Sequence, residues 1–173
     1  MKLFYNLILV ILLLTFTHQT VKAETYFIDF KFILNQSDAG KKANQQLKKQ
    51  LDDGFKKLKE REKQLQIEEK EIIKQKKILS PEEYKKKISS LRSKVTSLQK
   101  DRNTILESIS KKRAKARKAL LNTLNPILKE FMVEKNIKIV LDKKSILLAN
   151  DNLDITKDVM NMLNQKLKSI NLN

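Results

Sequence analysis

Leu79-Ser80-Pro81-Glu82-Glu83 is the one break in a long charged run that extends from Ser37 to Phe131. Ser80 is a favourable N-cap, Pro81 suits a first helical turn, and Glu83 follows Ser80 by three residues, as in a capping box. A chain that ends one helix and starts the next within about three residues reverses its direction. This stretch therefore predicts the turn of an antiparallel helical hairpin.

Apolar residues on both sides of this turn follow heptad spacing. After it they are Tyr84, Ile88, Leu91, Val95, Leu98, Ile105 and Ile109, with one step skipped at Arg102. Before it, Leu47, Leu51, Phe55 and Leu58 lead into Leu65, Ile72 and Leu79. Such spacing gives each helix an apolar stripe that a partner helix can cover. We expect two paired helices over residues 37–79 and 81–131, roughly 60 and 75 Å long.

The first 23 residues have the features of an export signal. Lys2 supplies a positive charge, Leu7 to Phe16 is apolar except for Thr15, and Ala23 is a small residue suited to cleavage. A retained anchor is the alternative, but an apolar core of about 14 residues falls short of the roughly 20 needed to cross a bilayer. We expect cleavage after Ala23, a periplasmic product, and loss of the only histidine, His18, with the signal.

Residues 24–38 and 120–173 are expected to form one small body around the hairpin arm of residues 39–119. Thr25–Phe30, Ile137–Asp142 and Ile146–Ala149 read as short strands, and a last amphipathic helix begins near Asp154 or Thr156. Pro126 should kink or restart the returning helix, and Asn136 can end it. Gly40 and Gly54 each cost about 1 kcal/mol within a helix, which implies a packing or flexibility role.

The predicted fold class is α+β and mostly α, with a long antiparallel coiled-coil hairpin inserted into a small three-stranded β body. Strands with open edges and a marginal core favour oligomerisation of this body. The candidate assembly residues are apolar residues of the three strands: Tyr26, Ile28, Ile139, Leu141 and Leu147.

Positive charge is confined to the arm. Residues 41–118 carry 26 Lys and Arg against 11 Asp and Glu, a net charge of +15, whereas the rest of residues 24–173 is neutral. A coiled coil needs surface charge for solubility, but that need alone predicts a balance of signs. The excess indicates anionic partners or electrostatic steering of them.

The sequence offers few residues suited to catalysis. The chain has no cysteine, its two glycines exclude a glycine-rich phosphate loop, and neighbouring carboxylates such as Glu82 and Glu83 point apart on a helix. Asp151, Asp154 and Asp158 lack the spacing and the glycine of a calcium loop. We expect no catalytic residues, no cofactor and no metal.

The chain resembles the Skp/OmpH family of periplasmic chaperones in the order of several segments. These are residues 26–29, 34–43, 125–127, 139–142 and 154–159, spread over nearly the whole chain after Ala23. The resemblance implies a homotrimer with a small β body and three helical arms around a cavity. That cavity would hold unfolded outer-membrane proteins without nucleotide. The lysine-rich tip departs from the family pattern.

Diffuse contacts along the arm would then bind the client. The candidates are the apolar residues Phe55, Leu58, Leu65, Ile72 and Tyr84 and the tip lysines Lys85, Lys86 and Lys87. One alternative is a basic coiled-coil module that binds anionic lipid or lipopolysaccharide. Nucleic acid is not expected as a partner, because Phe55 and Tyr84 are the only aromatic residues of the arm and an export signal precedes it.

Overall fold

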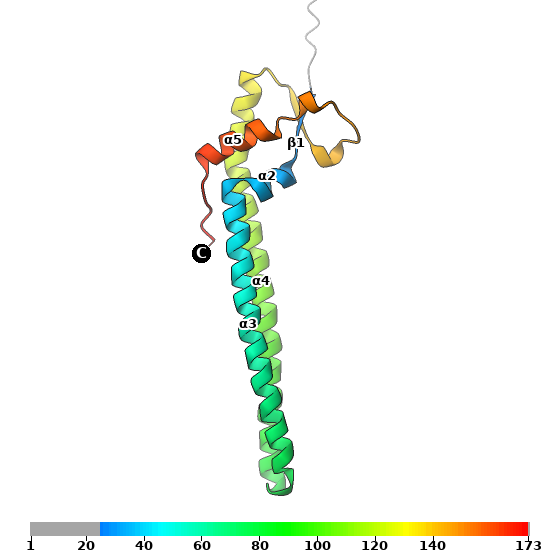
Figure 1. The fold of residues 1–173 in the computed structure, drawn as a ribbon, viewed down its shortest axis with the longest axis vertical. Coiled ribbons are helices and arrows are strands. Elements are labelled where there is room, and N and C mark those ends of the chain that lie inside the picture. Colours follow the sequence, from blue (N-terminus) through cyan, green and yellow to red (C-terminus); the bar gives the residue numbers. More distant parts are fainter. Residues whose placement is uncertain (1–24, 173) are drawn as a thin grey trace, which may run out of the picture.

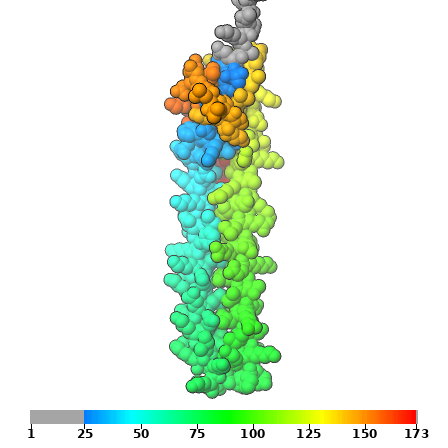
Figure 2. Space-filling view, turned by 90° about the vertical axis from the view of Figure 1, so that its right-hand side faces the viewer, coloured from blue at the N-terminus to red at the C-terminus, as the bar shows by residue number. Residues whose placement is uncertain are grey.

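The structure, a computed structural model, describes residues 25–172 and consists of a body at one end of a long helical arm (Figure 1). The arm is made by α3, Asp38–Lys74, and the first two thirds of α4, Pro81–Glu134. The two helices run antiparallel, and Figure 2 shows them as adjoining columns along the arm. The predicted export signal lies outside the described residues.

The turn of the hairpin forms where the sequence places it. A short 3-10 helix, Gln75–Lys77, follows α3, and Ser80 caps α4. The backbone N–H of Glu83 donates to Ser80 Oγ at 3.3 Å, and the Ser80 N–H donates to Glu83 Oε2 at 3.0 Å. The Ser80 N–H, together with the Ser80 hydroxyl, which donates to Glu83 Oε2 at 2.8 Å, holds the pKa of the Glu83 carboxyl below its usual value. The predicted capping box is confirmed.

At the root of the arm, Gly40 permits a sharp join between α2, Phe30–Gln36, and α3. Ser37 caps α3 by accepting a hydrogen bond from the Gly40 N–H at 3.2 Å. A Cβ on Gly40 would lie 2.0 Å from the backbone oxygen of Leu34. The cost of a helical glycine is therefore offset by a close approach that no other residue allows.

The sheet of the described residues has two strands, not the predicted three. β1, Thr25–Ile28, pairs in parallel with β2, Ile139–Asp142. Residues 146–149, predicted to be a strand, instead form an extended loop, and Leu147 and Leu148 are almost wholly exposed. The prediction of a third strand is wrong for this chain alone, because the segment finds no strand to pair with and no apolar surface to cover it.

The core of the body joins segments from both ends of the sequence. Its fully buried side chains include Ile33 of α2, Leu124 and Ile127 of α4, and Val159 and Leu163 of α5, Thr156–Lys166. Pro126 lies inside α4, and the helix does not restart there. Pro126 is exposed, whereas Leu124 and Ile127 are fully buried, so packing on the inner face maintains the helix across the lost hydrogen bond.

Asn136 ends the returning helix, as expected. It has a left-handed backbone with φ of 54°, and the next N–H, of Ile137, donates to Met132 O at 2.8 Å. Asparagine accepts this conformation more readily than most residues. The chain then enters β2 beside β1.

Beyond α5 the chain leaves the body and descends along the root of the arm (Figure 1). We call residues 167–172 the tail. Leu172 is only 2% exposed and belongs to a second apolar cluster with Ala43, Leu47, Ile109 and Ala116. The tail therefore ties the end of the chain to both helices of the arm.

Candidate functional site

A series of polar bonds crosses one side of the seam between α3 and α4. Lys87 donates to Gln75 Oε1 at 2.9 Å, Lys94 to Glu68 Oε1 at 2.6 Å, and Arg61 to Asp101. Successive bonds of these three are seven residues apart along both helices. Lys112 also donates to Gln50 Oε1 at 2.8 Å, and this bond fits the same alignment of α3 with α4. We call the first three bonds the polar ladder. Exposed pairs of this kind stabilise weakly, by less than about 1 kcal/mol each, but they select one alignment of the helices.

The ladder continues into a close contact at Gly54, seven residues before Arg61. A Cβ on Gly54 would lie 3.1 Å from Cδ1 of Ile105. This is tighter than an ordinary carbon contact, so the glycine serves packing between the two helices. The polar ladder and this contact together give the arm a fixed register.

Away from the polar ladder, the arm carries cation–aromatic contacts and a shallow groove. Arg102 lies 5.9 Å from the centre of the Phe55 ring, and Lys76 lies 5.9 Å from that of Tyr84. A shallow groove of about 330 Å³ is lined there by Phe55, Leu58, Lys59, Glu62, Leu98, Gln99 and Arg102. Cations over aromatic faces keep apolar surface and positive charge together. This part of the arm can therefore offer weak contacts to an apolar and acidic chain.

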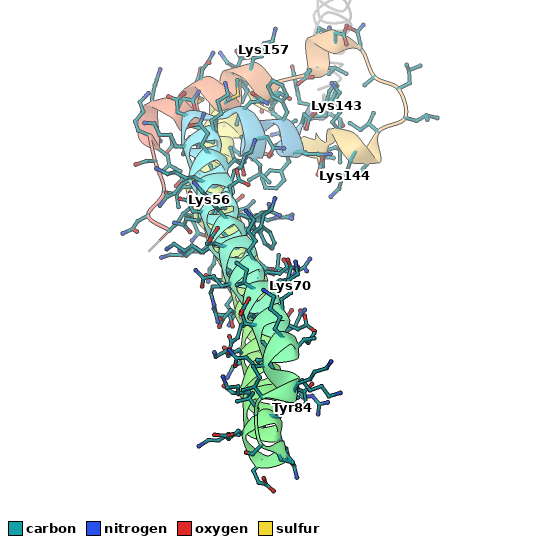
Figure 3. All side chains as sticks on the ribbon, turned by 60° about the horizontal axis from the view of Figure 1, so that its bottom comes forward. Lys56, Lys70, Tyr84, Lys143, Lys144 and Lys157 are labelled. Atoms are coloured by element: carbon teal, nitrogen blue, oxygen red, sulfur yellow. The ribbon has the colours of Figure 1, made fainter. Side chains whose placement is uncertain are left out.

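The structure divides the predicted client-binding residues between the seam and the surface. Leu58 and Ile72 are buried between the helices, so a client could touch them only if the hairpin opened. Leu65, Phe55 and Tyr84 are half-buried, and Lys85, Lys86 and Lys87 are exposed at the tip. Side chains project from the arm all round, Lys56 and Lys70 among them (Figure 3).

Several exposed apolar residues of the arm escaped the sequence analysis. Val95 was assigned to the seam but is 45% exposed, and four more were not considered: Ile67, Ile73, Ile78 and Leu106. The signal that could have found these four is an apolar residue out of heptad register within a charged helix. Such residues have no partner helix to cover them and are candidates for binding.

The candidate assembly residues likewise fall into two groups, one packed in the core and one exposed. Ile28 lies in the core of its own protomer, and Tyr26 packs against that core. By contrast, Ile139 is 50% exposed and Leu141 41% exposed on β2, and Leu147 is wholly exposed on the neighbouring loop. Exposed apolar residues beside a strand with an open edge are suited to association with another chain.

A cavity of about 460 Å³ lies near the junction of β1, α2 and α5, and its lining includes Asp29, Lys143 and Asp154. Burial raises the pKa of Asp154, but hydrogen bonds from Thr156 and Lys143 outweigh it and hold the pKa below its usual value. The N–H of Asp29 donates to Thr156 Oγ1 at 2.8 Å, so these contacts join the two ends of the body. Residues 25–172 contain no group of three His, Cys, Asp or Glu side chains placed to bind a metal.

The fold recurs in a protein of known structure. A crystal structure from Caulobacter crescentus CB15, provisionally described as an OmpH-like outer membrane chaperone, aligns with a TM-score of 0.79 over 90% of this chain and 92% of that one. Sequence identity is 19%, so this likeness shows the fold alone. No curated protein matches the chain. Among the helices of residues 25–172, none is both long and apolar enough to cross a membrane.

The sequence itself matches a family over most of its length. The model of the family described as Outer membrane protein (OmpH-like) matches residues 24–163, which include the arm, β2 and most of α5. The expected resemblance is confirmed: this chain belongs to the OmpH-like family of outer membrane proteins.

Proposed function

We propose that this chain is a periplasmic holdase chaperone that binds unfolded outer-membrane proteins without ATP and prevents their aggregation. The observation that carries this proposal is the arm, which combines a net charge of +15 with uncovered apolar side chains over its length. Unfolded barrel strands expose alternating apolar residues that aggregate in water. Many weak contacts, made by apolar groups and lysine stems, can hold such chains without a fixed binding geometry.

The family supports the chaperone role. The proposal adds the client, the compartment and a separate role for each of three parts of the chain. Residues 1–23 direct export, residues 24–38 and 120–173 assemble the protein, and residues 39–119 form the arm. Assembly gives a homotrimer in which Ile139, Leu141 and Leu147 meet other copies. Three arms around a shared space would surround a client that one thin arm can only touch.

Deletion of residues 60–102 tests the role of the arm. Lys59 and Asn103 each lie two residues from the Arg61–Asp101 bond, on the side toward the body. A short turn can therefore rejoin the two helices in register. The shortened protein should keep the mass of the assembly but lose protection of an unfolded porin, measured by light scattering. Protection equal to that of the full chain would contradict the proposal.

The alternative function, binding of anionic lipid or lipopolysaccharide, is favoured by one observation. Six of the eight residues from Lys111 to Lys118 are basic. Vesicle flotation in the absence of client separates the two functions. Flotation with anionic vesicles, combined with no effect on porin aggregation, would replace the holdase proposal with this one.

A further inference from the structure

The tail occupies the groove between the two helices at the root of the arm. α5 ends at Lys166, and Leu167 has an extended backbone with φ of −135° and ψ of 105°. Further along, Ile170 packs against both the body cluster and the arm-root cluster, and Leu172 is buried in the latter. Residues two apart in an extended chain point to the same side. Ile170 and Leu172 thus have the spacing of apolar residues on one face of a strand.

Polar contacts hold the junction of α5 and the tail, and Leu172 is buried among apolar side chains. Lys166 donates to Glu130 at 2.7 Å and Lys168 to Asp38 at 3.1 Å. Asn164 Oδ1 accepts from the Asp38 N–H at 2.8 Å. Leu172 lies beyond these contacts and is held by the side chains of the groove. Release of this residue from the groove therefore leaves the anchors near α5 in place.

The groove is built to accept an apolar side chain. Ala43 and Ala116 face each other from α3 and α4, and Leu47 and Ile109 complete the apolar walls. A cavity of about 420 Å³ beside Leu172 is lined by Thr104, Glu107, Ser108, Lys111, Lys112 and Lys115. Small residues leave room for an inserted side chain, and the lining carries three lysines against one carboxylate, that of Glu107, which is ion-paired with Lys111.

We propose that this groove is a client-binding site and that the tail is its intramolecular occupant. The ligand it fits is an extended polypeptide with apolar side chains at alternate positions, which is the pattern of an unfolded barrel strand. The inference rests on the proposed holdase function and names a site within it. The tail lies beyond residues 24–163, which the family model matches, so the matched residues do not include this occupant.

Competition follows from a shared site. A client that needs the groove binds only to the fraction of molecules whose tail is released, and its apparent dissociation constant rises accordingly. Leu172→Ser removes the apolar side chain that fills the groove, places no charge beside its lysines, and should release the tail. We expect an unfolded porin to bind this variant about three- to tenfold more tightly than the unmodified protein.

The matched control is Val133→Ser, which removes an apolar side chain that is exposed on the same helix as Ile109 and Ala116. It should bind the porin as the unmodified protein does. Circular dichroism checks that both variants keep their helix content. Unchanged or weaker binding by Leu172→Ser, with aggregation still prevented by the unmodified protein, would overturn the inference and leave the holdase function intact.

A reversible crosslink tests the same idea by comparing two states of one variant. The described residues contain no cysteine, so Leu172→Cys with Ala116→Cys introduces a single pair that can lock the tail in the groove. Oxidation should weaken porin binding, and reduction should restore it. Equal affinities in the two redox states, with the disulfide shown by mass spectrometry, would overturn the inference.

Discussion

The arm and the body obtain their stability from different arrangements of the same few residue types. The arm repeats one seam, in which buried and half-buried apolar side chains recur and three successive heptads add a polar bond across one side. The body instead gathers β1, α2, α4 and α5 around a single core, and these elements come from both ends of the chain. Damage to the arm should therefore stay local, whereas damage to the body should affect the whole fold and its assembly.

The largest expected contrast concerns assembly. Ile139→Asp places a charge on the exposed edge strand of the body and should convert the proposed trimer to monomers, because a carboxylate buried unpaired at the interface opposes association. Lys86→Asp at the arm tip should leave the trimer intact. Light scattering of residues 24–173 at micromolar concentration measures both. A stable monomer of the unmodified protein would show that the body does not assemble.

The two glycines give a second contrast, in stability. Gly40→Ala drives a Cβ into the backbone of Leu34 and should lower the free energy of unfolding by about 3 kcal/mol. Gly54→Ala meets only the flexible Ile105 side chain, and the gain in helix propensity of up to about 1 kcal/mol should roughly offset the crowding. Urea denaturation followed by circular dichroism gives both values. Equal losses would mean that the two positions are not constrained differently.

A third contrast separates the charge of the arm from its apolar contacts. Charge attraction between exposed groups is screened beyond about 8 Å at physiological salt, whereas apolar contact persists. Several hundred millimolar salt should slow porin association several-fold and change dissociation little. Replacement of Lys85, Lys86 and Lys87 by Gln should reproduce the effect on association. Stopped-flow fluorescence measures the two rates, and a steep loss carried mainly by dissociation would favour a polyanion binder.

The smallest effect is expected within the polar ladder. Glu68→Lys places a positive charge opposite Lys94 and should destabilise the arm by about 0.5 kcal/mol, since the pair is exposed. The exchanged pair, Glu68→Lys with Lys94→Glu, should recover the loss. Thermal unfolding at low salt compares the three proteins. Failure of the exchange to recover stability would show that this bond does not contribute to the alignment.

Local rules predicted the arm well because its structure depends on neighbours in sequence. Ser80 and Glu83 specify the turn, and heptad spacing specifies the seam. The polar ladder was harder to find, since it pairs residues up to 40 apart and requires the register of the hairpin to be known. The sequence showed which helices pair, but not which side of the pair would be polar.

The body could be predicted only in part because its elements depend on distant partners. Residues 146–149 have the composition of a strand, but a strand needs a neighbour to accept its hydrogen bonds. Likewise, the pattern around Pro126 could not reveal that Leu124 and Ile127 anchor the helix on both sides of it. The burial of Leu172 in the arm root was also unexpected, because an apolar residue near a chain end carries no signal of its destination.

The register of the polar ladder limits how such an arm can change in length. Each bond recurs after seven residues on both helices. An insertion or deletion confined to one helix would therefore place the residues of the bonds on its far side opposite the wrong partners. Only matched additions or losses in both helices, about fourteen residues in all, keep the bonds and the apolar stripe together. The length of the arm can thus change only in increments of roughly 10 Å, the rise of one heptad. Under the proposed function, the size of the client that the arms can surround would change in the same steps.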